Sequence, residues 1–125
     1  MHPSANDPDD LERFFVERAN AGDIEGLVAL YEENATLDAG DGKLIVGHDE
    51  LRRFFTDYLS SSPQFDPSLQ TPAVCSGDLA LTSSTLGNGD ITGEIARRQS
   101  DGTWLWVIDR FTLGQARSPF IQDGF

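Results

Sequence analysis

Residues 20–37 constrain the fold of this chain more than any other segment. Gly22 follows an apolar-periodic stretch and is typical of the residue that ends a helix. Asp23 comes directly after it, and an aspartate side chain suits the capping position of a second helix. Residues 35–37, Ala-Thr-Leu, then favour a strand. Two helices followed so closely by a strand indicate that the helices pack on a sheet rather than in a bundle.

Three helices are predicted in the first half of the chain. The first begins at Asp7-Pro8, where the aspartate can cap and the proline suits the first helical position. The second spans residues 23–31, with Tyr31 on its inner face, and the third spans residues 47–59. The third has the most regular apolar face of the chain, formed by Leu51, Phe54, Phe55, Tyr58 and Leu59.

Strands dominate the second half. Residues 35–39 and 44–46 are expected to pair around a glycine turn, and after residues 60–67 the apolar period changes from helical to alternating. Strands are expected near residues 68–75, 79–86, 91–98 and 104–112, separated by glycine-containing hairpin turns. This order predicts one α+β domain over residues 1–125, with helices on one face of an antiparallel sheet. Residues 1–6 are expected to be a mobile N-terminus and residues 114–125 a C-terminal tail.

Composition excludes several classes of function. The formal net charge of -12 and the pI near 4.2 argue against nucleic acid and anionic membranes as partners. Cys75 is the single cysteine, and no apolar run or signal peptide is present, so we expect a cytoplasmic protein without disulfides. His2 and His48 are far apart and give no metal-binding spacing, and no phosphate-binding glycine loop occurs. We therefore expect no metal and no cofactor.

Residues 20–37, 47–59 and 102–111 together resemble the nuclear transport factor 2-like superfamily. Within it, the chain is most similar to bacterial ketosteroid isomerases and to small polyketide cyclase-like bacterial proteins. The resemblance implies a cone in which a strongly bent mixed or antiparallel sheet wraps around three helices and encloses a pocket.

The catalytic groups of the isomerases are replaced in this chain. The positions of their two tyrosines fall on Phe15 and Phe55, and phenylalanine has no hydroxyl to donate. The position of the general base falls on Ala39, with Asp38 adjacent but on the opposite strand face. The remaining acid falls on Glu94 or Ile95, depending on the hairpin register. Steroid isomerisation by that set of residues is therefore not expected.

The last strand carries the principal candidate for catalysis. Matching it to the isomerases directs Leu105, Val107, Asp109 and Phe111 into the cone. Asp109 would then lie among apolar neighbours, which raises the pKa of a carboxyl group and suits acid–base chemistry. The alternative is that Asp109 forms a structural ion pair with Arg97, Arg98 or Arg110. An epoxide-hydrolase-like site would need Glu94, Arg98 and Asp109 all to point inward.

The expected pocket suits a small apolar organic ligand. Alternation also directs Ser83 and Thr85 inward beside Leu81, so part of the wall would be polar. The predicted ligand-binding residues are Phe15, Leu37, Phe55, Tyr58, Leu81, Ser83, Glu94, Val107 and Phe111, with Asp109 as the catalytic candidate. Three functions remain open: a ligand-binding protein, a cyclase-, isomerase- or dehydratase-like enzyme using Asp109, and a non-catalytic dimerisation or interaction module.

A second group of side chains on the last strand predicts a partner. Trp104, Trp106 and Ile108 are expected on the outer face of the sheet, where large apolar side chains usually mark an interface. The resemblance implies a homodimer formed through this face. The alternative is that the chain's own C-terminal tail covers one of the tryptophans.

Overall fold

The computed structural model describes residues 2–115. Three helices and six strands follow one another along the chain. They are α1 (Asp10–Asn20), α2 (Ile24–Val28), β1 (Tyr31–Asp38), β2 (Leu44–Val46), α3 (Gly47–Tyr58), β3 (Leu69–Ser76), β4 (Leu79–Thr85), β5 (Asp90–Arg98) and β6 (Trp104–Gln115). The order confirms the α+β class predicted from the change of apolar period.

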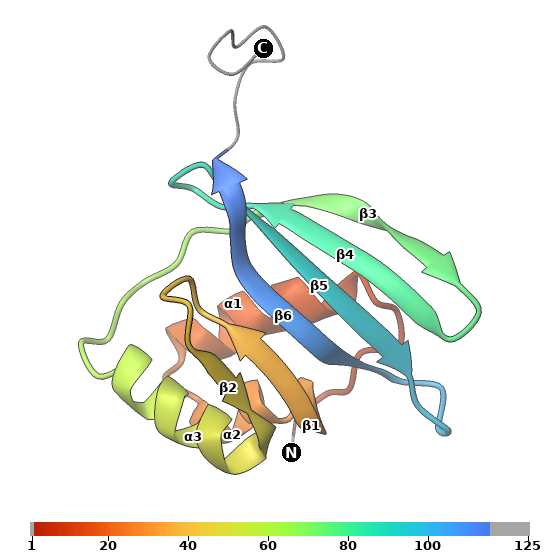
Figure 1. Cartoon of the computed structure of the whole chain (residues 1–125), viewed down its shortest axis with the longest axis horizontal. Helices are drawn as coiled ribbons and strands as arrows, with labels where there is room; N and C mark the ends of the chain where they lie inside the picture. Colours follow the sequence, from red (N-terminus) through yellow and green to blue (C-terminus); the bar gives the residue numbers. More distant parts are fainter. Residues whose placement is uncertain (1, 116–125) are drawn as a thin grey trace, which may run out of the picture.

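The strands form one bent sheet in the order β2-β1-β6-β5-β4-β3. All neighbours pair antiparallel except β1 and β6, which are parallel. The sheet is therefore mixed and curved, and its two edges do not meet, as the expected cone fold requires. Figure 1 shows α1 behind β5 and β6, and α3 at the end of the sheet formed by β1 and β2.

The helix boundaries follow the local signals except at the start of α1 and the end of α2. The expected start at Asp7-Pro8 was wrong: α1 begins at Asp10, with Asp9 at the N-cap position and no side-chain cap. Gly22 ends the first helical segment with a φ of 67°, a conformation that L side chains rarely adopt. The Asp23 carboxylate accepts a hydrogen bond from the Gly26 N–H at 3.0 Å and so caps α2. However, α2 is shorter than expected: it ends at Val28, and Tyr31 is the first residue of β1. The assignment of Tyr31 to a helix was wrong, because burial in the sheet outweighed its helical spacing.

A bulge in β6 changes which side chains face the interior. Ala96 of β5 pairs with Trp106, but the next residue back, Ile95, pairs with Ile108. Val107 is thus an extra residue on β6, and the alternation of side chains reverses across it. Trp106 and Asp109 consequently both point inward. The predicted outward position of Trp106 and inward position of Val107 were wrong for this reason.

β4 presents the opposite face from the one expected. Ala80, Thr82 and Ser84 are buried, whereas Leu81 is 51% exposed. The sequence alternates small polar and apolar residues on this strand, so local pattern alone does not decide its orientation. Pairing with β5 decides it, because Glu94, directly opposite Thr82, is also buried. The expectation that Leu81 and Ser83 face the pocket was wrong.

The segment before α1, expected to be mobile, is tied to the domain. The backbone of Ala5 bridges Trp104, and Ala5 is buried. The Arg18 guanidinium donates hydrogen bonds to the carbonyl oxygens of Pro3 and Gly26. Of the expected C-terminal tail, residues 114 and 115 belong to β6 and residues 116–125 lie outside the described part. No helix between residues 2 and 115 is long and apolar enough to cross a membrane.

Candidate functional site

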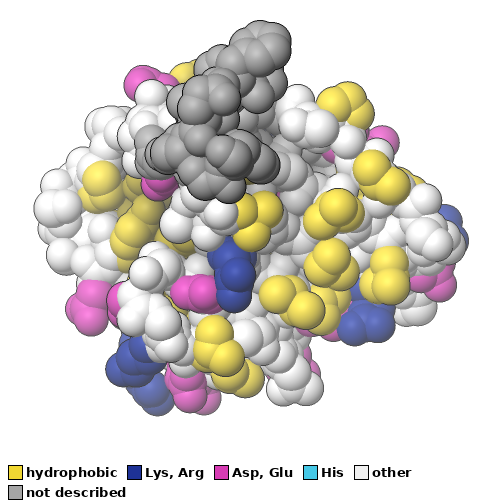
Figure 2. All heavy atoms as spheres, turned by 45° about the horizontal axis from the view of Figure 1, so that its top comes forward, with side chains coloured by type: hydrophobic (Ala, Val, Ile, Leu, Met, Phe, Trp, Pro, Cys, Tyr) yellow, Lys and Arg dark blue, Asp and Glu magenta, His cyan; other side chains and the backbone are white. Residues whose placement is uncertain are grey.

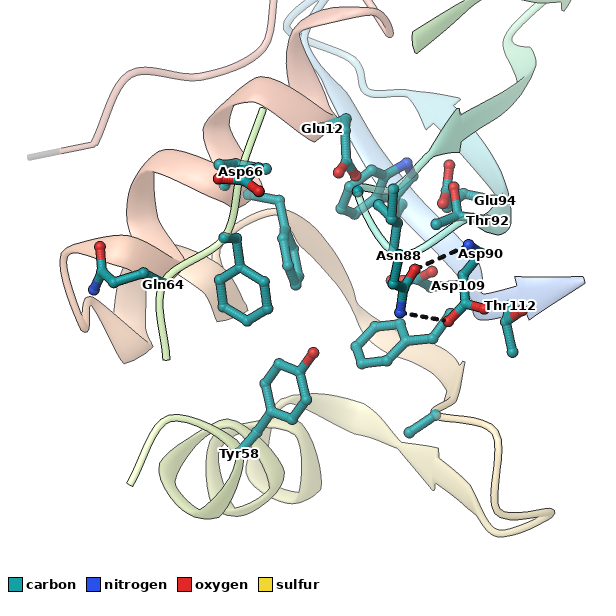
Figure 3. A pocket seen from close by; sticks show the side chains of 18 residues that line it. Glu12, Tyr58, Gln64, Asp66, Asn88, Asp90, Thr92, Glu94, Asp109 and Thr112 are labelled. Atoms are coloured by element: carbon teal, nitrogen blue, oxygen red, sulfur yellow. Dashed lines mark hydrogen bonds between the residues drawn. The ribbon is translucent and has the colours of Figure 1, made fainter. Parts of the chain in front are cut away.

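A cavity of about 420 Å³ lies between α1, α3 and the inner face of β5 and β6. The loop at residues 64–66 and the β4–β5 turn form its remaining wall. Aromatic rings and carboxyl groups make up most of the lining, whose side chains are drawn in Figure 3. The other lining residues are Val16, Ala39, Gln64, Leu86, Gly87, Asn88, Thr92 and Thr112.

Five aromatic side chains form the apolar wall: Phe15, Tyr58, Phe65, Trp106 and Phe111. They contact one another in a continuous row, with ring centroids 6.2 Å apart for Phe15–Phe111 and 5.6 Å for Tyr58–Phe111. Tyr58 also stacks on Phe65 at 5.9 Å. The phenol oxygen of Tyr58 points from α3 into the cavity (Figure 3). The wall is thus apolar and rigid, with one hydroxyl at its edge.

Three buried carboxyl groups also line the cavity. Glu12 comes from α1, Glu94 from β5 and Asp109 from β6, and their exposed fractions are 7%, 3% and 3%. Glu94 and Asp109 lie directly opposite each other on neighbouring strands. Burial is the main reason that the pKa of each group is raised, because it penalises the charged form. We call these three residues the carboxyl cluster.

Asp109 is held by a tyrosine and not by an arginine. The Tyr31 hydroxyl donates to Asp109 Oδ2 at 2.5 Å, entirely inside the protein. The three arginines considered as partners bind other carboxylates: Arg97 binds Glu32, Arg98 binds Asp78 and Arg110 binds Asp38. Burial, and next the nearby Glu94 charge, raise the pKa of Asp109 well above its ordinary value, although the Tyr31 hydrogen bond opposes this. Asp109 therefore forms no ion pair with these three arginines. Arg98, which an epoxide-hydrolase-like site would need to point inward with Glu94 and Asp109, binds Asp78 instead.

A short hydrogen-bond chain orients Glu94. The Trp106 indole N–H donates to Thr82 Oγ1 at 3.2 Å, and the Thr82 hydroxyl donates to Glu94 Oε1 at 2.6 Å. Burial raises the pKa of Glu94, while the hydroxyls of Thr82 and Thr92 oppose the shift. The register left open by the sequence thus places Glu94, and not Ile95, on the pocket side.

Sequence reasoning missed Glu12, although a signal for it existed. Glu12 lies three residues before Phe15 and four before Val16, which also line the cavity, so all three share one helix face. Its carboxylate accepts a hydrogen bond from the Ser68 hydroxyl at 3.1 Å. Burial and the neighbouring Glu94 charge raise the pKa of Glu12 to about 8. A glutamate on the apolar face of an amphipathic helix was the available sign.

Five of the ten predicted site residues line the cavity: Phe15, Tyr58, Glu94, Asp109 and Phe111. Leu37 and Phe55 are fully buried in the hydrophobic core, behind the cavity wall. Leu81, Ser83 and Val107 do not line it, for the reasons of strand orientation given above. Trp106, expected outside, is 1% exposed and lines the pocket, and Trp104 is 7% exposed beneath residue 5.

Ala39, the position matched to the isomerase base, and the adjacent Asp38 point to opposite sides of the chain, as expected for neighbouring residues of a strand. Ala39 lines the cavity, whereas Asp38 is turned away and binds Arg110 at 3.2 Å. A methyl group therefore occupies the position of a catalytic base. The acid–base groups of this pocket come from α1, β5 and β6 instead.

The mouth of the pocket is held by two local contacts. Asn20 at the end of α1 donates its side-chain amide to the Phe65 carbonyl at 3.0 Å and accepts from the Phe65 N–H at 2.7 Å. In the opposite turn, Asn88 accepts from the Asp90 N–H at 2.9 Å (Figure 3). Over residues 2–115, no group of three or more histidine, cysteine, aspartate or glutamate side chains is arranged to hold a metal ion.

Comparison with known proteins agrees with the fold. The model of a family described as SnoaL-like domain matches residues 11–117. No curated protein matches the chain. Solved structures do match: a protein of unknown function from Mycobacterium tuberculosis is 21% identical with a TM-score of 0.67, over 89% of this chain and 70% of that one.

Two further structures carry names that describe the fold. A ketosteroid isomerase-like protein from Erwinia carotovora atroseptica is 19% identical with a TM-score of 0.65, over 82% of this chain and 89% of that one. An NTF-2 like protein of unknown function from Shewanella oneidensis is 17% identical with a TM-score of 0.67, over 82% and 93%. At these identities the likeness concerns the fold, which is that of the nuclear transport factor 2-like proteins.

Proposed function

We propose that this chain, which belongs to the SnoaL-like domain family, binds a small and largely apolar organic molecule. The observation that supports this most directly is the cavity of about 420 Å³, lined by both aromatic rings and carboxyl groups. Pockets for small molecules have volumes of roughly 300–1,000 Å³ and combine apolar walls with a few polar groups. A purely structural interior would be filled, since protein cores pack without voids of this size.

The two kinds of lining residue suit the two parts of such a ligand. The row formed by Phe15, Phe111 and Tyr58 offers flat apolar surface for a ring system. Asp109 and Glu94 offer oxygen atoms that can accept a hydrogen bond, or donate one when protonated. The ligand would therefore be an apolar ring compound with a polar group at one end.

The test is a binding screen combined with a variant that fills the cavity. Native mass spectrometry of the purified protein detects small molecules that remain bound, and calorimetry measures affinity for the compounds found. Ala39→Phe places a ring at the cavity wall, and we expect it to abolish binding. Ala21→Phe, on the exposed end of α1, is the matched control. Equal binding by both variants would refute the assignment of the ligand to this cavity.

A second function, acid–base catalysis, is favoured by the pairing of Glu94 with Asp109. Two carboxyl groups facing each other in a buried site resist ionising together, so one holds a proton while the other can act as a base. Such a pair suits an isomerase-, cyclase- or dehydratase-like reaction on a bound carbonyl or hydroxyl compound. Asp109→Asn would then remove turnover and leave ligand binding measurable. Retention of turnover in this variant would leave ligand binding as the function.

We also propose that the outer sheet face pairs two copies of the chain. Val74, Leu81, Ile95 and Ile108 lie opposite one another on β3, β4, β5 and β6 and form an apolar stripe across the sheet. Figure 2 shows hydrophobic side chains gathered on this face. The stripe replaces the surface expected from Trp104 and Trp106, both of which are buried within the monomer. Sedimentation equilibrium tests the proposal.

A further inference from the structure

The ionisable side chains of the pocket are all acidic or phenolic. Five carboxyl residues line it: Glu12, Asp66, Asp90, Glu94 and Asp109. Among the described residues that line the cavity there is no lysine, arginine or histidine. Three of the carboxyl groups, the carboxyl cluster, are almost completely buried. The described wall therefore places no positive side chain beside Glu12, Glu94 and Asp109.

Aromatic rings line the same cavity as these carboxyl groups. Faces of aromatic rings carry partial negative charge and attract a cation within about 6 Å of their centre. Phe15, Trp106 and Phe111 are neighbours within the wall, with centroids 6.1 Å apart for Phe15–Trp106 and 6.2 Å for Phe15–Phe111. The aromatic rings and the carboxyl groups of the lining thus favour the same type of ligand group, one that is positively charged and partly desolvated.

We infer that the ligand of this pocket is an amine with an apolar, ring-containing body. Its ammonium group binds at the carboxyl cluster and its body lies between the aromatic rings. This inference rests on the proposed function, because it assumes that the cavity is the binding site, and it adds the chemical class of the ligand. It predicts weaker binding of carboxylates and phosphates, because they bring no positive charge to stabilise an ionised carboxyl group of the cluster.

The energetic argument separates an amine from a neutral compound of the same shape. Without a ligand, Glu12 keeps its proton near neutral pH because burial raises its pKa to about 8, and burial also raises the pKa of Glu94 and of Asp109. An ammonium ion stabilises the carboxylate form, so one carboxyl group releases its proton to solvent when the amine binds. A neutral alcohol brings no charge and leaves the protons in place. Amine binding should therefore strengthen as pH rises toward 8, and alcohol binding should not.

Several other ionisable groups lie near the carboxyl cluster, and their protonation also bears on the pH dependence of binding. Tyr31 donates to Asp109, and the pKa of its phenol is raised far above the ordinary value by burial and by Asp109. Burial also raises the pKa of Tyr58 on α3, so both phenols stay neutral over this pH range. The remaining charged groups on the wall are Asp66 in the loop before β3 and Asp90 at the start of β5.

Three compounds of nearly equal size and different charge provide the test. Naphthylethylamine, naphthylethanol and naphthylacetate are titrated into the wild-type protein by calorimetry at pH 6, 7 and 8. We expect the amine to bind at least about tenfold more tightly than the alcohol at pH 8. Its affinity should rise by up to about tenfold per pH unit if one proton is released. Titrations in buffers of different ionisation enthalpy measure that proton directly.

Variants identify the groups responsible. Glu12→Gln and Glu94→Gln each keep the side-chain shape and remove one carboxyl group from the cluster. We expect each to reduce amine affinity by about tenfold or more and to weaken its pH dependence. Glu17→Gln makes the same change on an exposed position of α1 and serves as the matched control. The comparison of the three compounds on the wild-type protein does not depend on the folding of any variant.

The outcomes separate the inference from the proposed function. Tighter binding of the amine with release of a proton supports both. Equal or tighter binding of the alcohol or of the carboxylate overturns the inference and leaves the ligand-binding function in place. Failure of all three compounds to bind at millimolar concentration counts against both.

Discussion

Because Glu12 is buried, it makes the folding stability of this protein decrease as pH rises. Its pKa is raised from 4.5 to about 8 in the folded state, mainly by burial. Between these two values the folded chain keeps the Glu12 proton and the unfolded chain does not. The folded state therefore binds more protons, and the free energy of unfolding falls as pH rises. The contribution is complete below pH 4.5 and is lost as pH approaches 8.

Substitution by glutamine isolates this effect. Each pH unit in the window corresponds to 1.36 kcal/mol per proton, so the penalty in the wild type grows by about 3 kcal/mol between pH 5 and pH 7. Glutamine carries no charge and can accept the Ser68 hydrogen bond through its amide oxygen. Relative to wild type, Glu12→Gln should thus be nearly neutral at pH 5 and stabilising by about 3 kcal/mol at pH 7.

Urea denaturation followed by tryptophan fluorescence measures the difference at both pH values. In thermal melts, the same difference corresponds to a gain of roughly 10 °C at pH 7. Glu17→Gln, on the same helix but exposed, should shift the free energy of unfolding by less than about 0.5 kcal/mol at either pH. A Glu12→Gln effect that is the same at pH 5 and pH 7 would show that Glu12 does not hold a proton in the folded state, and would refute the reasoning.

Three further predictions concern single contacts. Tyr31→Phe removes the donor to Asp109, and we expect it to destabilise the fold by about 1–3 kcal/mol and to raise the pKa of Asp109 further, as measured by denaturation and by NMR titration. Asn20→Ala removes both hydrogen bonds to Phe65; a loss of about 1–3 kcal/mol and faster amide exchange in residues 60–68 are expected, and unchanged exchange would contradict the role of Asn20 at the mouth. Leu81→Asp places a charge on the apolar stripe and should yield monomers in sedimentation equilibrium while the melting temperature of the monomer is retained; unaltered dimers would exclude this face.

Much of the architecture was predictable because it depends on local chemistry. The strand at residues 44–46 was predicted with its observed bounds, and the third helix ends one residue earlier than expected. Gly22 and Asp23 end one helix and cap the next as their side chains and conformations dictate. These signals act within a few residues of the chain. Tyr31 was misassigned because its helical spacing competes with burial in the sheet, which only the packed chain shows.

Half of the candidate site was predictable, and the rest depended on strand orientation. Asp109 and Phe111 lie beyond the β6 bulge and face inward as expected. Trp106 lies before it, and one extra residue reverses its direction. The two faces of β4 differ too little in hydrophobicity for its orientation to be predicted from its own residues. Glu12 was left out because the apolar face of its helix was defined by hydrophobic residues alone.

By itself, the sequence determined most of the turns, the order of helices and strands, and the nuclear transport factor 2-like fold. The tertiary structure alone decided which side chains meet in the pocket. The bulge at Val107 brings Trp106 and Asp109 to one face, and α1 carries Glu12 to within the field of Glu94. The physical reason is the sequence separation over which each effect acts. Caps, turns and periodicity depend on residues close together in the chain, whereas the pKa of a buried carboxyl group depends on residues that only folding brings together.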